Sequence, residues 1–333
     1  ILERDRMRKL ALSDEILLKV DKAARYIGGE VNSVMKDKNE VEIRFAMCFP
    51  DVYEIGMSNL GMMILYNMFN QREDVWCERL FSPWPDLDKV MREKKIPLFA
   101  LESQEPIRDF DFLGITIGYE MCYTNILQVL DLSGIPLKSA DRGEDFPIVI
   151  GGGACAYNPE PLAPFFDMFY IGEGETVYDA LFDAYKANKK AGGSRRDFLL
   201  AAAKIPGIYV PSLYEVTYKE DGTIASFAPT ADGVPEKVQK QLIIDMEKEY
   251  RAVEAPVVPH IKATQDRVTL EIQRGCIRGC RFCQAGMIYR PTRERDVETL
   301  KESARIMLKN TGHEEISLSS LSSSDYSQLK ELV

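Results

Sequence analysis

The sequence predicts an α/β protein whose N-terminal half is a doubly wound parallel sheet, covered by helices on both faces. Apolar runs of strand length alternate with helical segments between residues 41 and 190, and this alternation is typical of parallel sheets with crossover helices. Near the C-terminus, a short apolar run leads into a loop with three cysteines and then into a helical segment. The 333 residues, 45% of them hydrophobic and 28% charged, suffice for two domains with buried cores.

Local patterns define the elements of the first half. Apolar residues recur at helical spacing from Leu12 to Ile27, which predicts a leading helix that ends at Gly28 and Gly29. Five apolar runs are the strand candidates, at residues 42–49, 96–101, 112–118, 147–153 and 168–175. In a parallel sheet of this kind, ligands bind beyond the carboxyl ends of the strands.

The second half begins with a polar, glycine-containing stretch at residues 186–197, which we interpret as a linker. Residues 213–229 alternate on either side of Asp221-Gly222, a turn dipeptide that predicts a β-hairpin. A strand at 267–272 then leads into the cysteine loop, and a helix over 297–310 follows it. The expected domains are an N-terminal helical extension (1–40), an α/β domain (41–190), a linker with the hairpin (191–262) and a last unit (263–333).

The net charge is −10, with 42 Lys and Arg against 52 Asp and Glu, which argues against a general electrostatic grip on nucleic acid and leaves a locally basic site open. No apolar run reaches the roughly 18–20 residues that span a bilayer, so we expect no membrane partner. Seven cysteines without a signal peptide predict thiols in a reducing compartment, hence a cytoplasmic protein.

Cys276, Cys280 and Cys283 stand in a C-x3-C-x2-C run with no fourth cysteine nearby. Three thiolates on a 4Fe-4S cluster leave one iron free to bind a non-protein ligand. A structural zinc site or an electron-carrying cluster would need a fourth protein ligand, and the chain has only two histidines, His260 and His313. The other cysteines are interpreted as buried thiols: Cys48, Cys77, Cys122 and Cys155.

The run CIRGCRFC resembles the signature of the radical SAM superfamily, with Phe282 at its aromatic position. This resemblance implies a β/α barrel, a 4Fe-4S cluster held by the three cysteines, and S-adenosylmethionine bound to the open iron and cleaved to a 5′-deoxyadenosyl radical. It also implies that Phe282 lies beside this cofactor. The next strand of the family carries a Gly-Gly-Glu-like segment; here Ser319, Ser320 and Leu321 occupy that place, so we expect Ser319 and Ser320 to contact S-adenosylmethionine.

The segment from Asp51 to Gly56 resembles the D-x-H-x-x-G loop of cobalamin-binding domains, which implies a Rossmann- or flavodoxin-like domain. Tyr53 replaces the histidine that ligates cobalt, so histidine ligation is excluded. A glycine-rich turn after a strand allows close approach of a bulky ligand. The resemblance implies these cobalamin-binding residues: Asp51, Tyr53, Gly56, Gly151, Gly152 and Gly153. The run YIGEGE, with Glu173 and Glu175, is typical of N-terminal domains that accompany radical SAM barrels.

Six arginines lie between Arg274 and Arg295, against one acid in that stretch, Glu294. They are interpreted either as a solvated loop and helix start or as a site for the carboxylate of the cofactor, the reduced cluster or an anionic substrate. The sequence does not choose between these interpretations.

We expect the chain to be an N-terminal fragment, because it begins at Ile1 and because residues 267–333 provide about two units of a barrel. The resemblance implies that the full-length protein is a radical SAM enzyme with an external electron donor, an unknown substrate and, as an option, cobalamin. Two alternatives stay open: a ligand-binding module with a structural metal, and a methylthiotransferase-like enzyme that would need three further cysteines for a second cluster.

Overall fold

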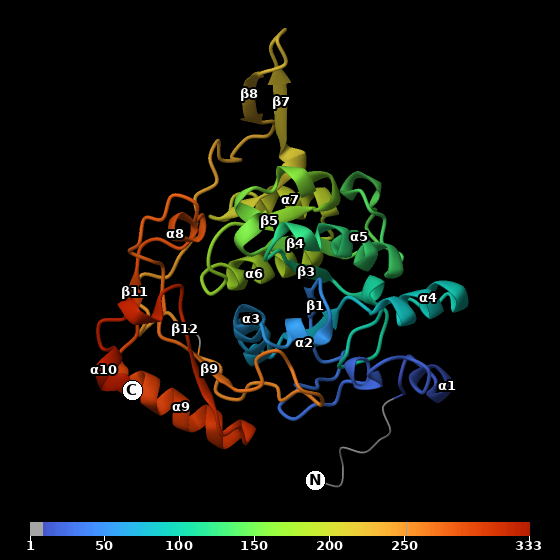
Figure 1. Cartoon of the computed structure of the whole chain (residues 1–333). Helices are drawn as coiled ribbons and strands as arrows, with labels where there is room; N and C mark the ends of the chain where they lie inside the picture. Colours follow the sequence, from blue (N-terminus) through green and yellow to red (C-terminus); the bar gives the residue numbers. More distant parts are fainter. Residues whose placement is uncertain (1–8, 251) are drawn as a thin grey trace.

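The computed structural model describes residues 9–250 and 252–333 of the chain. Its centre is a six-stranded sheet in the order β2-β1-β3-β4-β5-β6 (Figure 1). All pairs are parallel except β5 with β6, so the sheet is mixed, with one antiparallel edge strand. The strands are β1 (Ile43–Phe49), β2 (Val75–Phe81), β3 (Phe112–Thr116), β4 (Ile148–Gly152), β5 (Met168–Tyr170) and β6 (Ile208–Tyr209).

Helices cover both faces of this sheet, as the sequence predicts. Alternate residues of β1 enter different cores: Phe45 and Met47 pack with α3, α6 and α7, whereas Ala46 and Cys48 pack with α4 and α5. The helices are α3 (Leu60–Gln71), α4 (Pro85–Lys94), α5 (Tyr123–Leu132), α6 (Tyr178–Lys190) and α7 (Arg195–Ala202). The parallel part has the flavodoxin-like order 2-1-3-4-5, whose switch point lies between β1 and β3.

Two expected elements are wrong. The leading helix is replaced by α1 (Asp14–Leu17) and a 3₁₀ turn, η1 (Ala23–Arg25). Lys22, directly before η1, has a left-handed backbone with φ 50°, which a continuous helix through 12–27 does not allow. The run 96–101 is not a strand; residues 98–101 are buried, whereas Ile96 is half-buried and Pro97 is exposed. Its backbone is satisfied elsewhere: the Leu98 N–H donates to the end of α5 at Leu132, and the Leu101 N–H donates to Arg79.

Strand β2 is missing from the sequence expectation. Its run VWCERLF contains Glu78 and Arg79, which interrupt the apolar pattern of a buried strand. Both side chains are nevertheless fully buried, because each has an ion-pair partner: Arg44 for Glu78, and Glu30 and Glu102 for Arg79. Tertiary pairing therefore permits charged residues at core positions.

Beyond residue 190 the polypeptide first completes the sheet and then projects from it. Helix α7 and strand β6 lie within residues 191–262, the range expected to hold the linker and the hairpin, and the sheet therefore continues to residue 209. The domain boundaries themselves stay predictions. The predicted hairpin is confirmed as β7 (Tyr214–Tyr218) and β8 (Ile224–Pro229), which project from the body of the molecule (Figure 1).

The C-terminal part is one strand–helix–strand unit with its own core. Strands β9 (Val268–Glu271) and β12 (Ile316–Ser319) pair in parallel, and α9 (Val297–Thr311) connects them. The carboxylate of Asp296 caps α9 by accepting from the Glu298 and Thr299 N–H groups. Between β9 and α9 lie β10 (Gln273–Arg274), α8 (Ala285–Ile288) and β11 (Arg293–Glu294). A β/α barrel beyond this unit stays a prediction.

Shorter elements complete the described residues, in which no helix is long and apolar enough to cross a membrane. They are α2 (Tyr53–Gly56), α10 (Leu329–Leu332) and the 3₁₀ turns η2 (Ile107–Asp109), η3 (Glu120–Cys122), η4 (Ser139–Asp141), η5 (Ala154–Tyr157), η6 (Glu160–Phe165), η7 (Pro211–Leu213) and η8 (Ser323–Asp325).

Candidate active site

The three cysteines lie on an irregular loop closed at its base by the antiparallel pair β10–β11. The base requires glycine: Gly275 has φ 84°, and a Cβ there would lie 2.6 Å from the Pro291 carbonyl oxygen. Cys276 and Cys283 are half-buried and Cys280 is exposed. The Cys283 N–H donates to the Cys280 carbonyl at 3.1 Å.

The donor set fits an iron–sulfur cluster in its chemistry, because three thiols stand on one short loop with no histidine among them. In residues 9–250 and 252–333, no three His, Cys, Asp or Glu side chains are gathered closely enough to hold a metal ion. Residues 275–284 form no helix or strand, so the loop can close around a cluster without breaking regular structure.

A cavity of about 860 Å³ lies between the carboxyl ends of the main sheet and the β9–β12 unit. From the sheet, it is lined by the ends of β3 and β4, by the start of α3 and by the loop after β5. From the other side it is lined by β9 and β12 and by Arg274, Gly275 and Tyr289, which flank the cysteine loop. The cavity thus adjoins the switch point, where ligands bind in sheets of this order.

The residues expected to contact S-adenosylmethionine lie in two places. Ser319 and Ser320 line the cavity at the end of β12, and the Ser320 and Ser323 hydroxyls are 2.9 Å apart. Phe282 is 92% exposed and does not line the cavity. The structure therefore brings the two serines, but not Phe282, to this cavity.

The residues expected to bind cobalamin are also divided between the cavity and other places. Gly152 and Gly153 line the cavity, and a Cβ on Gly152 would find its nearest contact at 4.0 Å, so the space above this glycine is open. Gly151 does not line it; a Cβ there would lie 2.7 Å from the Ile117 side chain. Gly151 is thus required by packing between strands, and only the two following glycines face a ligand-sized space.

Asp51, Tyr53 and Gly56 do not line the cavity. Tyr53 is 1% exposed and its hydroxyl donates to Glu30 at 2.9 Å. Burial and the neighbouring Glu30 carboxylate raise the pKa of Tyr53, so its phenolate is not available to a metal. A Cβ on Gly56 would lie 2.2 Å from the ring of Phe81, and the Asp51 carboxylate accepts from the Tyr119 hydroxyl.

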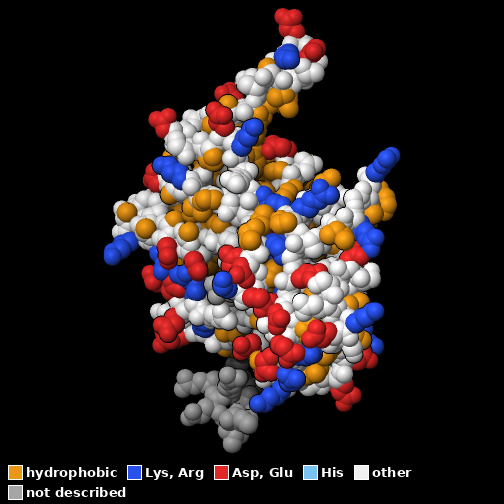
Figure 2. Space-filling model, turned by 90° about the vertical axis from the view of Figure 1, so that its left-hand side faces the viewer, with side chains coloured by type: hydrophobic (Ala, Val, Ile, Leu, Met, Phe, Trp, Pro, Cys, Tyr) orange, Lys and Arg blue, Asp and Glu red, His pale blue; other side chains and the backbone are white. Residues whose placement is uncertain are grey.

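The six arginines between 274 and 295 divide into three groups. Arg293 and Arg295 are buried and Arg274 is nearly so, whereas Arg278 pairs with Asp325, its Nε and an Asp325 oxygen 2.7 Å apart. Arg281 and Arg290 are exposed. On the face shown in Figure 2, Lys and Arg side chains of the described residues are scattered among Asp and Glu. The solvated interpretation therefore fits only some of these arginines.

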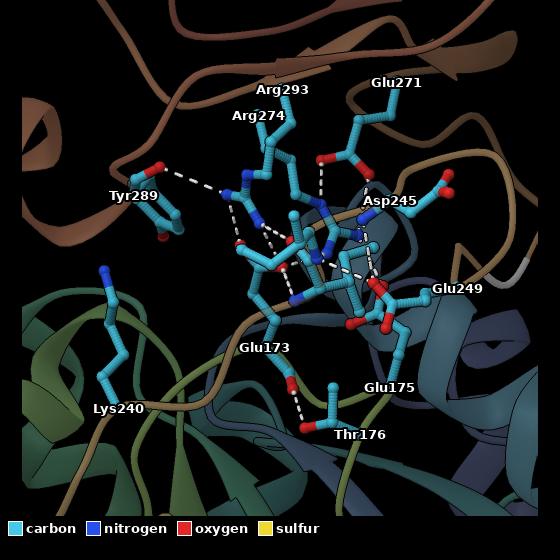
Figure 3. A network of polar contacts seen from close by, with 12 residues as sticks. Glu173, Glu175, Thr176, Lys240, Asp245, Glu249, Glu271, Arg274, Tyr289 and Arg293 are labelled. Carbon is cyan, nitrogen blue, oxygen red and sulfur yellow. Dashed lines mark hydrogen bonds and ion pairs between the residues drawn. The ribbon is translucent and has the colours of Figure 1, made fainter.

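Two of these arginines, Arg274 and Arg293, form a polar network with the YIGEGE run (Figure 3). Arg293 donates to both oxygens of Glu173, at 2.7 and 2.8 Å. Arg274 donates to Glu175 at 2.6 Å, to Glu173 at 3.1 Å and to both oxygens of Glu271 at 3.0 Å. Burial opposes ionisation of Glu173, but the hydrogen bond from Arg293 and the charges of Arg274 and Arg293 lower the pKa of this carboxyl.

Gln273 is a cavity residue that the sequence does not reveal. It is 2% exposed, and its Nε2 donates to the Ser322 carbonyl at 2.8 Å. Its Oε1 faces no hydrogen-bond partner among the described residues. Buried acceptors are normally satisfied, so Gln273 is a candidate to accept a hydrogen bond from a bound water or ligand. Only its position directly before the cysteine loop hints at this role in the sequence.

Two protein-family models match this chain, one in the N-terminal half and one in the C-terminal part. Residues 61–211 match the family model of radical SAM proteins, N-terminal, and residues 270–333 match that of the radical SAM superfamily. The chain therefore carries a radical SAM N-terminal domain and a radical SAM domain, which confirms the resemblance found in the sequence. Members of this superfamily use a 4Fe-4S cluster and S-adenosylmethionine.

Among individual proteins, the uncharacterized protein MJ0966 of Methanocaldococcus jannaschii is 26% identical over 288 residues. The match covers 86% of this chain and 51% of MJ0966, so the chain spans about half the length of this curated relative. Two structures of TsrM from Kitasatospora setae, a radical S-adenosylmethionine methyltransferase, are also similar. The structure with tryptophan and aza-SAM is 15% identical with a TM-score of 0.45, and the match covers 87% of this chain and 50% of TsrM. The structure with cobalamin and a 4Fe-4S cluster is 13% identical with a TM-score of 0.45, and the match covers 88% of this chain and 50% of TsrM.

Proposed function

We propose that the full protein is a radical SAM enzyme in which Cys276, Cys280 and Cys283 hold a 4Fe-4S cluster and the adjoining cavity receives S-adenosylmethionine. The observation that carries this proposal is the three-cysteine loop at the end of β9, whose flanking residues line a cavity of about 860 Å³. When bound, the cluster and S-adenosylmethionine supply reductive formation of a 5′-deoxyadenosyl radical. The electron comes from an external donor, and we place the enzyme in the cytoplasm.

Residues of this chain provide the surroundings for that chemistry. Ser319 and Ser320 offer hydroxyl and backbone groups at the end of β12, and Gln273 offers a free acceptor on the same wall. The sheet side contributes apolar residues such as Met47, Ile64 and Ile150, which help to exclude water from a reactive intermediate. We propose that the reacting part of the substrate also binds in this cavity.

Anaerobic reconstitution of the full-length protein tests the proposal. We expect about four irons and four sulfides per chain, and 5′-deoxyadenosine should form when S-adenosylmethionine and a reductant are added. Metal analysis and chromatography of the nucleoside product measure these outcomes. One zinc per chain with no iron would refute the proposal and favour the alternative of a ligand-binding module with a structural metal.

The methylthiotransferase alternative has weaker support, because its second cluster would need three more thiolates. Cys48, Cys77, Cys122 and Cys155 are all buried, and burial raises the pKa of each thiol. Since the thiolate is the form that binds iron, buried neutral thiols are poor ligands. Analysis showing eight rather than four irons per chain would reverse this conclusion.

We infer that cobalamin is a second ligand of the cavity, because Gly152 and Gly118 line it and neither has an atom closer than 4.0 Å to an added Cβ. The described lining contains no histidine, so the cobalt would have no protein base as lower ligand.

We expect hydroxocobalamin to bind in equilibrium dialysis. Gly152→Val should weaken binding at least about tenfold by filling the open space, whereas Gly143→Val, at an exposed glycine outside the cavity, should not. Absence of binding to the unsubstituted protein would remove cobalamin from the proposal.

A further inference from the structure

Both ends of the cysteine loop are tied to the N-terminal domain. Arg274 lies two residues before Cys276, and Arg293 is its register partner across the β10–β11 pair. These two arginines close the loop at its base, and both donate to carboxylates of the loop that follows β5, Glu173 and Glu175 (Figure 3). The N-terminal domain therefore contacts the cysteine loop at its base, where β10 and β11 end and the irregular loop begins.

The contacts are buried and charge-assisted. The Glu175 side chain is 3% exposed, and the Arg293 side chain is 6% exposed. Arg293 binds Glu173 through two N–H groups, the geometry in which an arginine–carboxylate pair fixes orientation as well as distance. The Oε2 atom of Glu173 also accepts from Arg274 at 3.1 Å and from the Ile243 N–H at 3.0 Å. These hydrogen bonds leave few other positions in which the two arginines and the two carboxylates would all keep their partners.

A separate contact holds the far side of the loop. Lys240 Nζ donates to the carbonyl oxygens of Ile288 at 3.0 Å and Arg290 at 2.8 Å, just after α8. The neighbouring Gln241 accepts from the Glu173 N–H at 2.9 Å. Residues 240–243 and Glu173 thus form one unit that touches the loop at both ends.

We propose that Glu173 and Glu175 are positioning residues for the cluster: through Arg274 and Arg293 they set where the cysteine loop lies relative to the cavity. This inference rests on the proposed radical SAM function for its effect on activity, but not for its effect on the loop. Because reaction rates are sensitive to misplacement of about 1 Å, a loosened loop should retain its cluster and lose productive cleavage of S-adenosylmethionine.

The test compares the full-length protein with the double variant Glu173→Gln/Glu175→Gln. The control is Glu302→Gln, which breaks an exposed ion pair with Arg305 on α9. Hydrogen exchange of the protein without cofactors should become at least about tenfold faster in residues 276–292 of the double variant and stay unchanged in β1, β3 and β4. Unchanged exchange in 276–292 would overturn the inference.

The rate of 5′-deoxyadenosine formation per cluster is a second measurement, and it would not change if Glu173 and Glu175 only stabilised the fold. After reconstitution, we expect the double variant to hold iron within about 20% of the unsubstituted protein and to form 5′-deoxyadenosine at least about tenfold more slowly per cluster. Equal rates per cluster would overturn the inference. If the unsubstituted protein forms no 5′-deoxyadenosine, the proposed function fails, while hydrogen exchange still decides the positioning role.

A milder variant serves if the double variant does not fold. Glu175→Gln alone keeps the Glu173–Arg293 pair and removes only the charge that Arg274 contacts at 2.6 Å. Faster exchange in residues 276–292 would support the inference, and exchange equal to that of the unsubstituted protein would contradict it.

Discussion

Replacing Cys276, Cys280 or Cys283 by alanine in the full-length protein is expected to abolish both the cluster and the formation of 5′-deoxyadenosine. Three thiolates already leave one iron without a protein ligand, so the loss of another exposes a second iron. We expect iron content to fall to background in each variant and product formation to fall by more than about a hundredfold, since removal of the cluster removes the electron source. Iron analysis, visible absorption and nucleoside chromatography measure these changes.

Cys77→Ala is the matched control for the cysteine variants. Cys77 is fully buried on the edge strand β2 and lies outside the cavity. We expect this variant to keep its iron and its rate and to lose only a small amount of stability, because a single sulfur is removed from the core. Iron retained by the Cys280→Ala variant, or lost equally from Cys77→Ala, would contradict the assignment of the cluster to the loop.

Arg79→Met is expected to destabilise the protein by about 3–5 kcal/mol, the cost typical of breaking a buried ion pair. Arg79 is 0% exposed; its Nε donates to Glu102 at 2.6 Å, and its Nη2 donates to Glu30 at 2.7 Å. Methionine fills similar volume but leaves two carboxylates buried beside an apolar side chain. Equilibrium unfolding in denaturant, followed by circular dichroism, measures the change.

The pH dependence separates this charge effect from a loss of packing. In the native protein burial opposes ionisation of Glu30, but Arg79 holds the pKa of Glu30 below 4.5, so its contribution to stability is present above that value and lost as the pH falls. Without Arg79, the folded-state pKa of Glu30 should rise, so the loss in unfolding free energy caused by Arg79→Met should become smaller as the pH is lowered. A loss in unfolding free energy that does not change with pH would contradict this account.

Arg305→Met on α9 is the control for the Arg79 variant. The Arg305 side chain is 68% exposed in its pair with Glu302, and exposed pairs contribute little to stability. We expect a change within about 0.5 kcal/mol. A loss comparable to that of Arg79→Met would mean that burial is not the cause of the larger effect.

Elements with an uninterrupted local signal were predictable from the sequence. Strands β3 and β4 are apolar runs, β1 is apolar except for Arg44, and β9 alternates apolar and polar residues. The hairpin follows from Asp221-Gly222, and α9 has the spacing of an amphipathic helix with Asp296 as its cap. Strand β2 was not predictable, because its buried Glu78 and Arg79 read as surface residues until their partners are known. The leading helix was predicted wrongly, since Lys22 turns the backbone into a left-handed conformation.

The C-x3-C-x2-C loop after a strand and the alternation of strands with helices can be recognised from the sequence alone, because each pattern depends on residues close together in the chain. The tertiary structure alone decided that Gly152 rather than Gly151 faces the cavity, that Tyr53 is held by Glu30, and that the arginines flanking the cysteines bind Glu173 and Glu175. The Arg293–Glu173 and Arg274–Glu175 pairs span 120 and 99 positions of sequence. A contact of that kind exists only once the sheet and the β9–β12 unit have packed together, because no local pattern fixes the distance between such residues.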